Sequence, residues 1–379
     1  MKLLHISDLH IGKRVYGYSM LEEQAWMFQK ILEEMERIQP DGVILAGDVY
    51  DKTVPPAEAV GLFDWFLTAM LEKTAYVFMI SGNHDSPERL AFGAALLQRS
   101  GVYVSPAYLG RIDPISVQDA FGEVRIYLLP FLKPPMVRRF FPGQAIETYD
   151  DMARAVLQSL PLEGNVRNVL VAHQFLTGSL PSESEEVSVG GLEQISAAAL
   201  EGFDYVALGH LHRPQNVGWE TIRYCGTPLK YSFSEARDSK SMTVVTLEEK
   251  GQVRVETVPL TPRRDMREIR GNYMEVTDRR RYAGSNTEDF VHIILTDEQD
   301  VPGAMDKLRA VYPNLLRLSY DNARTRAQAG VSAAAGAPLR KTPLEWFASL
   351  YAQQNGQPMS AAQETWMRDM MQQVWEEQQ

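Results

Sequence analysis

Residues 76–85 read YVFMISGNHD, a short apolar run that leads into Gly-Asn-His-Asp. A similar arrangement occurs upstream, where residues 43–48 read VILAGD. Short apolar runs that end at turn residues predict buried strands. Apolar residues recur at helical spacing in three neighbouring segments, 20–38, 57–71 and 87–98. This strand–helix alternation predicts an α/β fold with a mostly parallel sheet covered by helices.

The strand pattern continues toward residue 260. Residues 124–129, 169–172 and 205–208 are further apolar runs of strand length. Residues 242–247 and 253–258 follow, joined by Lys250-Gly251, and we expect them to form a hairpin that closes a first domain over residues 1–260.

The chain after residue 260 divides into three parts. Strand and helix patterns between residues 261 and 322 predict a small α+β domain. Residues 323–341 are rich in alanine and nearly lack large apolar residues, as is typical of a flexible linker. Residues 342–379 then predict a tail of two short helices.

Composition limits the class of protein. The 379 residues carry a formal net charge of −11, so binding of a polyanion would need a local site, a metal or a partner. Cys225 is the single cysteine, which excludes an intramolecular disulfide and fits a reducing compartment. No apolar run reaches the roughly 20 residues of a membrane helix, and Asp8 interrupts any signal-peptide core. We expect a soluble cytoplasmic protein.

Potential metal ligands gather where predicted strands end. Of the seven histidines, only His5 and His292 lie outside these segments. Because ligands bind at the carboxyl ends of strands in open α/β sheets, residues far apart in sequence can share one crevice. The candidate ligands are Asp8, His10, Asp48, Asn83, His173, His210 and His212.

The residue types indicate the kind of metal. Oxygen and nitrogen donors without thiolates suit Mn²⁺, Fe²⁺ or Zn²⁺. Asp8 and His10 are two residues apart, so on an extended strand end we expect their side chains to point the same way. Seven donors suit two ions if one carboxylate bridges them, and such a pair can activate water for attack on phosphorus.

Each motif alone has an ordinary structural explanation. Asp-x-His and Gly-Asp are common in turns, and His173 alone would more often be a hydrogen-bonded core residue than a ligand. Gly82-Asn83-His84-Asp85 is more specific, and Gly-His-x-His at residues 209–212 moderately so. The conjunction in this order at strand ends is what favours a metal centre.

These motifs together resemble the calcineurin-like metallophosphoesterase superfamily. Residues 6–13 (ISDLHIGK), 224–229 (YCGTPL) and 343–347 (PLEWF) resemble its SbcD branch of bacterial nucleases. The resemblance covers nearly the whole chain and implies a four-layer α/β sandwich with a small capping domain over 261–322 and an ATPase-docking tail over 342–379.

The resemblance also implies residue roles. One metal ion, most often Mn²⁺, is assigned to Asp8, His10, Asp48 and His212. The second is assigned to Asp48, Asn83, His173 and His210, with Asp48 bridging. His84 then faces the scissile phosphate as the catalytic residue that assists the leaving group, and we expect Asp85 to orient it. Asp51 is left open between a residue supporting the site, a DNA contact and a turn carboxylate, and Cys225 is expected to pack.

Three hypotheses for function remain at this point. The resemblance implies a DNA nuclease, with 3′→5′ exonuclease action on double strands and endonuclease action on single strands and hairpins, in complex with the SMC-like ATPase SbcC. A phosphatase or cyclic-nucleotide phosphodiesterase on the same fold is the alternative, although the arginine that serine/threonine phosphatases carry after the second motif is replaced by Lys52-Thr53. A catalytically inactive scaffold is the third, and the complete ligand set argues against it.

Other surfaces have two interpretations each. Residues 261–281 contain seven arginines and four acidic residues, 7 − 4 = +3, and Arg279-Arg280-Arg281 could contact phosphates or only face solvent. The predicted helices 57–71 and 87–98 carry more apolar residues than one buried stripe needs, which fits either a homodimer or burial within the chain. The resemblance implies a dimeric habit and so favours the homodimer. The tail is rich in Met and Trp at helical spacing, which favours docking on a partner over folding back.

Overall fold

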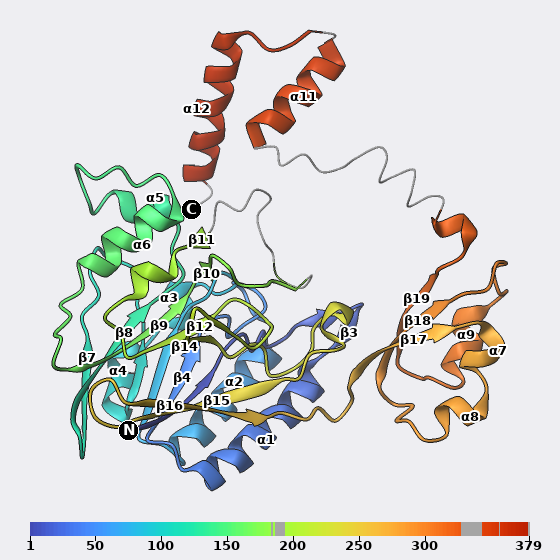
Figure 1. Cartoon of the computed structure of the whole chain (residues 1–379), viewed down its shortest axis with the longest axis horizontal. Helices are drawn as coiled ribbons and strands as arrows, with labels where there is room; N and C mark the ends of the chain where they lie inside the picture. Colours follow the sequence, from blue (N-terminus) through green and yellow to red (C-terminus); the bar gives the residue numbers. More distant parts are fainter. Residues whose placement is uncertain (183–184, 186–193, 327–342, 356, 378–379) are drawn as a thin grey trace. The chain divides into compact units, whose positions relative to one another are not determined.

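The computed structural model of this chain describes residues 1–182, 185, 194–326, 343–355 and 357–377 (Figure 1). The described residues divide into two compact units, one within residues 1–322 and the other from residue 323 onward. Within these described ranges, none of the helices has the length and apolar character needed to cross a membrane.

A six-stranded mixed sheet forms the first layer of the larger unit. Four neighbouring strands are parallel, and β15 pairs antiparallel with β1 at one side. The order across the sheet is β16 (Val253–Pro259), β15 (Ser241–Leu247), β1 (Lys2–Ile6), β4 (Gly42–Ala46), β5 (Tyr76–Ile80) and β6 (Val102–Val104). The predicted hairpin of residues 242–258 is confirmed, and it extends this sheet.

A second six-stranded sheet packs against the first. Its order is β13 (Gln215–Val217), β14 (Trp219–Tyr224), β12 (Tyr205–Gly209), β9 (Arg167–His173), β8 (Gly122–Leu129) and β7 (Ile115–Asp119). Alternate residues of the central strands face the other sheet, since successive side chains of a strand point to opposite faces. Leu3, Ile44 and Phe78 therefore share a core with Ile126, Val171 and Tyr205.

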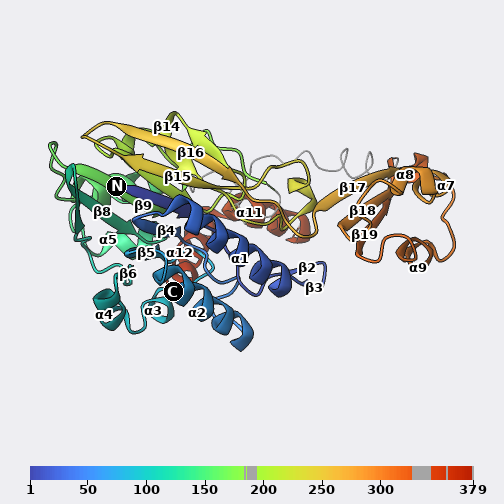
Figure 2. The same ribbon diagram turned by 90° about the horizontal axis from the view of Figure 1, so that it is seen from below.

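Two long helices cover the outer face of the first sheet (Figure 2). Helix α1 (Leu21–Ile38) buries Phe28, Ile31 and Met35, and α2 (Ala57–Leu71) buries Phe63 and Phe66. Strands β1 and β4 are consequently buried on both faces, which explains why β4 is continuously apolar and why β1 is apolar apart from Lys2 and the buried His5. The α/β sandwich of two mixed sheets flanked by helices is thus confirmed.

The predicted helix over residues 87–98 is wrong as a single element. Two one-turn helices, α3 (Pro87–Leu90) and α4 (Ala94–Leu97), take its place and are followed by a short 3₁₀ turn. Gly93 between them has φ of 73° in the left-handed region, where an α-helix cannot continue.

Residues 266–320 form a third, three-stranded sheet. Strands β17 (Met266–Gly271), β18 (Phe290–Leu295) and β19 (Leu315–Tyr320) are parallel, with short helices α7 (Tyr273–Val276), α8 (Arg279–Tyr282) and α9 (Ala304–Arg309) in the connections. The sheet has its own core around Val291, Ile293 and Leu308. Met266 and Phe290 instead join the core beneath the first sheet, and a domain boundary at residues 260/261 stays a prediction.

The predicted tail helices are present in the second unit. Helices α11 (Pro343–Asn355) and α12 (Ala361–Glu377) contact one another through Gln363 Nε2, which donates to the Tyr351 hydroxyl at 3.0 Å. Ser360 and Gln363 form a capping box at the start of α12. Residues 323–326 are helical, and the rest of the predicted linker, residues 327–341, lies outside the described residues.

Candidate metal centre

All the predicted ligands lie at the carboxyl ends of parallel strands from the two packed sheets. Asp8 and His10 follow β1, Asp48 follows β4, and Asn83 follows β5. His173 is the last residue of β9, while His210 and His212 follow β12. Because the two sheets end side by side, ligands from 200 residues of sequence converge, as the sequence predicted.

The backbone geometry of the ligand loops differs from the expected one. We predicted an extended strand end for Asp8 and His10, but their φ angles are 54° and 44°, in the left-handed region. Asp48 (47°) and His210 (102°) also have positive φ. Such angles cost non-glycine residues about 1–3 kcal/mol each and persist where the surroundings fix them, commonly at functional sites.

Hydrogen bonds between the ligand loops hold these conformations. The backbone N–H of Asp8 donates to Gly47 O at 3.0 Å, and that of His10 donates to Asp48 O at 2.9 Å. The N–H of His210 donates to Asp8 Oδ1 at 3.0 Å. The loops after β1, β4 and β12 therefore fix one another.

One cluster of donor atoms is formed by Asp8, His10 and His212, whose ligand atoms all lie within 4.8 Å of one another. The Nε2 atoms of His10 and His212 are 3.1 Å apart. His10 Nδ1 is buried and has no hydrogen-bond partner among the described residues. The two Nε2 atoms face each other closely enough for both to bind one cation.

A second cluster surrounds Asn83. Its Oδ1 lies 3.1 Å from His173 Nε2 and 3.0 Å from His210 Nδ1. His173 Nε2 lies 3.3 Å from Asp48 Oδ2, and its Nδ1 lies 2.8 Å from the Ala46 carbonyl, which leaves Nε2 facing the centre. A backbone carbonyl on the other ring nitrogen is the usual way in which a ligating histidine is oriented.

Asp48 lies between the two clusters. Its Oδ2 is 3.8 Å from His10 Nε2 as well as 3.3 Å from His173 Nε2. Its Oδ1 accepts a hydrogen bond of 2.8 Å from the His84 backbone N–H. Asp8 is a second carboxylate near histidines of both clusters. It lies 3.9 Å from His173, and its ligand atom is within 4.8 Å of those of His10 and His212.

The glycines of the motifs provide space for this convergence. A Cβ on Gly82 would lie 2.1 Å from Asp48 Oδ1, and one on Gly209 would lie 1.8 Å from the Ala46 carbonyl oxygen. The glycines in Gly-Asn-His-Asp and Gly-His-x-His are therefore required by close packing of the ligand loops.

Burial and the contact between Asp48 and His173 set the pKa values of the ligand side chains. It raises the pKa of Asp8 to about 6 and lowers the pKa of His210 to about 3. Burial alone would also lower the pKa of His173, but the adjacent Asp48 carboxylate outweighs it and raises that pKa to about 9. Asp48 conversely has a lowered pKa: burial opposes ionisation, and the charge and hydrogen bond of His173 overcome it. A fixed carboxylate beside buried imidazoles is a donor set that fits divalent cations.

His84 lies beside the centre with a different set of contacts. Its ring is 4.8 Å from the His10 ring, edge to face, and its Nδ1 lies 3.0 Å from the Asp51 carbonyl oxygen. The expectation that Asp85 orients this ring is wrong. The Asp85 carboxylate instead accepts hydrogen bonds from the backbone N–H groups of Val49, Tyr50 and Gly82, so it joins two ligand loops.

Asp51 supports the site through two contacts. Its Oδ1 lies 2.7 Å from Lys13 Nζ and 3.7 Å from His10 Nδ1. Of the alternatives left open by the sequence, these contacts favour a role in supporting His10.

Several residues around the ligands had no recognisable signal in the sequence. Glu235 Oε1 lies 3.6 Å from His212 Nδ1, and its other oxygen forms a buried ion pair with Lys240. Ser7 donates a short hydrogen bond to Asp8. Cys225 is fully buried 3.1 Å from the Ser7 hydroxyl, and burial raises its thiol pKa, in agreement with the expected packing role. The contacts that Glu235 and Ser7 make with the ligands are revealed only by the three-dimensional structure.

The arginines of residues 261–281 are mostly paired with carboxylates. Arg267 contacts Asp289, Arg270 contacts Asp321 and Arg281 contacts Glu275. Arg280 contacts Asp278 within its own turn. Glu275 and Asp278 are already counted in the excess of +3, and Asp289 and Asp321 outside the segment offset two more charges, which weakens the interpretation of this segment as a phosphate-binding patch.

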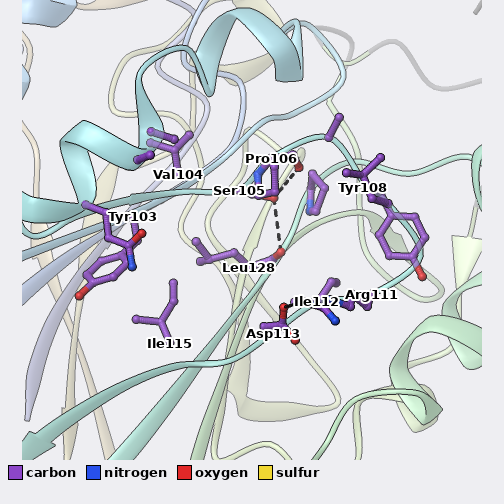
Figure 3. Close-up of a pocket in the computed structure, with 16 residues that line it drawn as sticks. Tyr103, Val104, Ser105, Pro106, Tyr108, Arg111, Ile112, Asp113, Ile115 and Leu128 are labelled. Atoms are coloured by element: carbon purple, nitrogen blue, oxygen red, sulfur yellow. Dashed lines mark hydrogen bonds and ion pairs between the residues drawn. The ribbon is translucent and has the colours of Figure 1, made fainter.

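One cavity beside the sheets lies away from the metal ligands (Figure 3). It measures about 400 Å³ and is lined by Tyr103, Val104, Ile115 and Leu128 among others. None of the predicted ligands lines it, so we assign it no part in the chemistry.

Comparison with known proteins agrees with this geometry. Residues 1–214 match the family described as calcineurin-like phosphoesterase, and residues 262–355 match a family described as type 5 capsule protein repressor C-terminal domain, SbcD_C. A curated relative from Staphylococcus epidermidis, named as the D component of the nuclease SbcCD, is 33% identical over 323 residues, covering 84% of this chain and 85% of the relative. The chain belongs to the SbcD family of calcineurin-like phosphoesterases.

The chain is also similar to two further proteins. The corresponding SbcCD nuclease component of Staphylococcus saprophyticus is 32% identical over 84% of both chains. A crystal structure of a dimetal phosphatase from Danio rerio aligns with 69% of this chain at 13% identity and a TM-score of 0.38. As a member of the SbcD family, the chain is a metal-dependent phosphoester hydrolase of the nuclease type.

Proposed function

We propose that this chain is a two-metal DNA nuclease that acts in DNA end processing, recombination, replication and repair. Asp8, His10, Asp48 and His212 hold one divalent ion, and Asp48, Asn83, His173 and His210 hold the other. The observation that carries this proposal is the position of Asp48, whose carboxylate lies 3.3 Å and 3.8 Å from histidines of the two clusters. Oxygen and nitrogen donors without thiolate suit Mn²⁺, Fe²⁺ or Zn²⁺, and family membership favours Mn²⁺ among them.

Bound divalent ions supply Lewis-acid chemistry, which polarises a phosphoryl oxygen and activates water. The residues of the chain hold the reacting groups in place. His84 has its Nδ1 engaged at the Asp51 carbonyl, so its Nε2 is the atom that can give a proton to the departing oxygen. Asp85 and the glycine contacts hold the loops that carry His84 and Asp48 in register.

We further propose 3′→5′ exonuclease action on double strands and endonuclease action on single strands and hairpins. This substrate range comes from family membership, as does the cytoplasmic, nucleoid-associated location. The arginines of residues 267–281 are paired with carboxylates, which gives little support to strong phosphate contact by the small domain. We propose that this domain orients the DNA duplex through the DNA backbone without reading bases.

The partner in this proposal is the SMC-like ATPase SbcC, and the tail is its docking element. Helices α11 and α12 expose Trp346, Leu350 and Trp366. Two short helices with large exposed apolar side chains are typical of an element that inserts into a groove of a partner. The relatives that are named as one component of an SbcCD nuclease support a partner of this kind.

A homodimer is also proposed, formed through α2 and the α3–α4 segment. The exposed fractions are 86% for Phe92, 69% for Leu96 and 41% for Trp65. Large apolar side chains that are exposed in this way favour an association surface. Phe92 and Leu96 lie on either side of Gly93, where the predicted helix is broken, and both are exposed.

The test is cleavage of a supercoiled plasmid and an end-labelled duplex by the purified chain with Mn²⁺. A phosphotyrosine-type ester serves as the competing substrate for the alternative, a phosphatase or cyclic-nucleotide phosphodiesterase. We expect DNA cleavage that is lost with a chelator and in Asp48→Ala. Hydrolysis of the small ester without DNA cleavage would favour the alternative, and retained nuclease activity in folded Asp48→Ala would refute the bridging role.

A further inference from the structure

Two adjacent polar residues of α1, Glu23 and Gln24, are almost fully buried. Their exposed fractions are 1% and 0%. Buried polar side chains are stable only when they are hydrogen-bonded or paired. The partners of these two residues lie in different parts of the molecule, and neither residue belongs to the predicted ligand set.

Gln24 binds the backbone of the loop that carries His10. Its Nε2 donates to the carbonyls of Leu9 and His10 at 3.1 Å and 2.8 Å, and its Oε1 accepts from the Gly12 N–H at 3.1 Å. The Tyr231 hydroxyl lies 3.0 Å from the same Nε2 and donates to the Leu9 carbonyl at 2.6 Å. One side-chain amide therefore satisfies three backbone groups of this loop.

These contacts bear on the ligand because the loop is strained. Asp8 and His10 both have left-handed φ, which needs external support to persist. The N–H groups of Asp8 and His10 are held by the β4 loop, on the side of Asp48. Gln24 holds the carbonyls of Leu9 and His10 from α1, so the two sets of contacts together fix the direction of the His10 ring.

Glu23 binds the segment that enters the third sheet. Its Oε1 lies 3.0 Å from both Arg263 Nη2 and Arg264 Nη1. Arg264 also donates to the Tyr18 hydroxyl at 2.7 Å, and the Tyr18 ring packs against Phe290 of β18 with centroids 4.8 Å apart. A buried carboxylate with two arginine partners is costly to break, because removal of one side leaves charge without compensation.

We propose that Gln24 is a positioning residue for His10, and that Glu23 and Gln24 together couple the segment at Arg263–Arg264 to the metal-binding loop. The proposal rests on the proposed ligand role of His10. Both contacts are made from one turn of a helix that is packed along the first sheet. A change in the Arg263–Arg264 segment or in the metal-binding loop that shifts this turn therefore also alters the contact with the other. Because linkage is reciprocal, metal binding should also stabilise the Arg263–Arg264 contact.

The experiment measures Mn²⁺ binding to the full chain by titration calorimetry. Gln24→Glu keeps the size of the side chain and its acceptor for Gly12, but places an oxygen against two carbonyl oxygens. We expect one Mn²⁺ site to weaken by about tenfold or more, the usual effect of losing a partner that orients a ligand. Glu23→Gln, which contacts no residue of the loop, should weaken the same site by about fivefold.

Glu22→Gln is the matched control. Glu22 is the neighbouring residue, also lies 3.0 Å from Arg263 Nη2, and has a largely exposed side chain. Its substitution should leave Mn²⁺ affinity at the wild-type value. If Gln24→Glu does not fold by circular dichroism, Gln24→Met, which keeps the length without the polar amide, replaces it.

Hydrogen exchange gives the reciprocal measurement. Mn²⁺ should slow amide exchange in residues 263–266 of the wild type and have a smaller effect in Glu23→Gln. Wild-type Mn²⁺ affinity in folded Glu23→Gln overturns the coupling, and wild-type affinity in a folded Gln24 variant overturns the positioning role. Absence of Mn²⁺ binding in the wild type would instead refute the proposed function.

Discussion

Substitution of His84 separates catalysis from metal binding. The His84 side chain contacts the Asp51 carbonyl and the edge of the His10 ring, whereas the Asp48 carboxylate is held by the backbone N–H of His84. His84→Ala removes the ring and keeps that N–H. The carboxylate proposed to bridge the metals should therefore stay in place in the variant.

The expected magnitude follows from the role of a proton donor. Loss of a general acid reduces turnover by about 10²–10⁴-fold, or about 3–5 kcal/mol of transition-state stabilisation. Metal affinity should change by less than the roughly tenfold that loss of an orienting partner costs. The ring also lies close enough to His10 and Asp48 for the three residues to form a potential metal-binding group, with ligand atoms within 4.8 Å, so the metal titration distinguishes a ligand from a proton donor.

The assay pairs single-turnover cleavage of an end-labelled duplex with calorimetric titration of Mn²⁺. Asn83→Ala serves as the control, because its amide oxygen lies between His173 and His210 and its loss should weaken one metal site directly. Loss of a Mn²⁺ equivalent in His84→Ala would make His84 a ligand and refute the assignment. Turnover within about threefold of wild type would refute the role in leaving-group departure.

Three further predictions concern association and stability. Removal of residues 343–379 should abolish co-purification with an SbcC-type ATPase and leave Mn²⁺-dependent cleavage of single strands intact; unchanged ATPase affinity would show that the tail is not the docking element. Light scattering should give a dimer for the wild type and a monomer for Trp65→Glu/Phe92→Glu, and a monomeric wild type at micromolar concentration contradicts the proposed interface. Hydrogen bonds from Arg167 lower the pKa of Asp119, so its stabilising contribution is complete above the unfolded pKa near 3.8 and is lost as pH falls below it. The gap in unfolding free energy between wild type and Asp119→Asn should accordingly be constant near pH 6 and shrink below about pH 4, and a gap independent of pH would contradict this linkage.

Much of the centre could be predicted from the sequence because each ligand follows a recognisable apolar strand. The glycines beside Asp48, Asn83 and His210 mark places where loops pack too closely for a Cβ, and that requirement is visible in the motifs. The left-handed backbone at Asp8 and His10 was not predicted, since it depends on hydrogen bonds to a loop 40 residues away.

Features that depend on distant partners were missed for the same reason. The arginines of residues 261–281 gave a positive local charge, but their partners Glu23 and Asp321 lie in other elements. Gly93 breaks a helix whose apolar periodicity continues through it, because the backbone conformation at a glycine does not alter the pattern of its neighbours. The role expected for Asp85 with the family resemblance was to orient His84, whereas its carboxylate satisfies backbone amides of two loops.

The most direct test of the central claim is anomalous diffraction from crystals of the chain soaked in Mn²⁺. The bridging role of Asp48 predicts two manganese peaks about 3.5–4 Å apart, on either side of the Asp48 carboxylate. One peak should lie beside His10 and His212 and the other beside Asn83 and His173. A single peak, or two peaks that do not share Asp48, would contradict it.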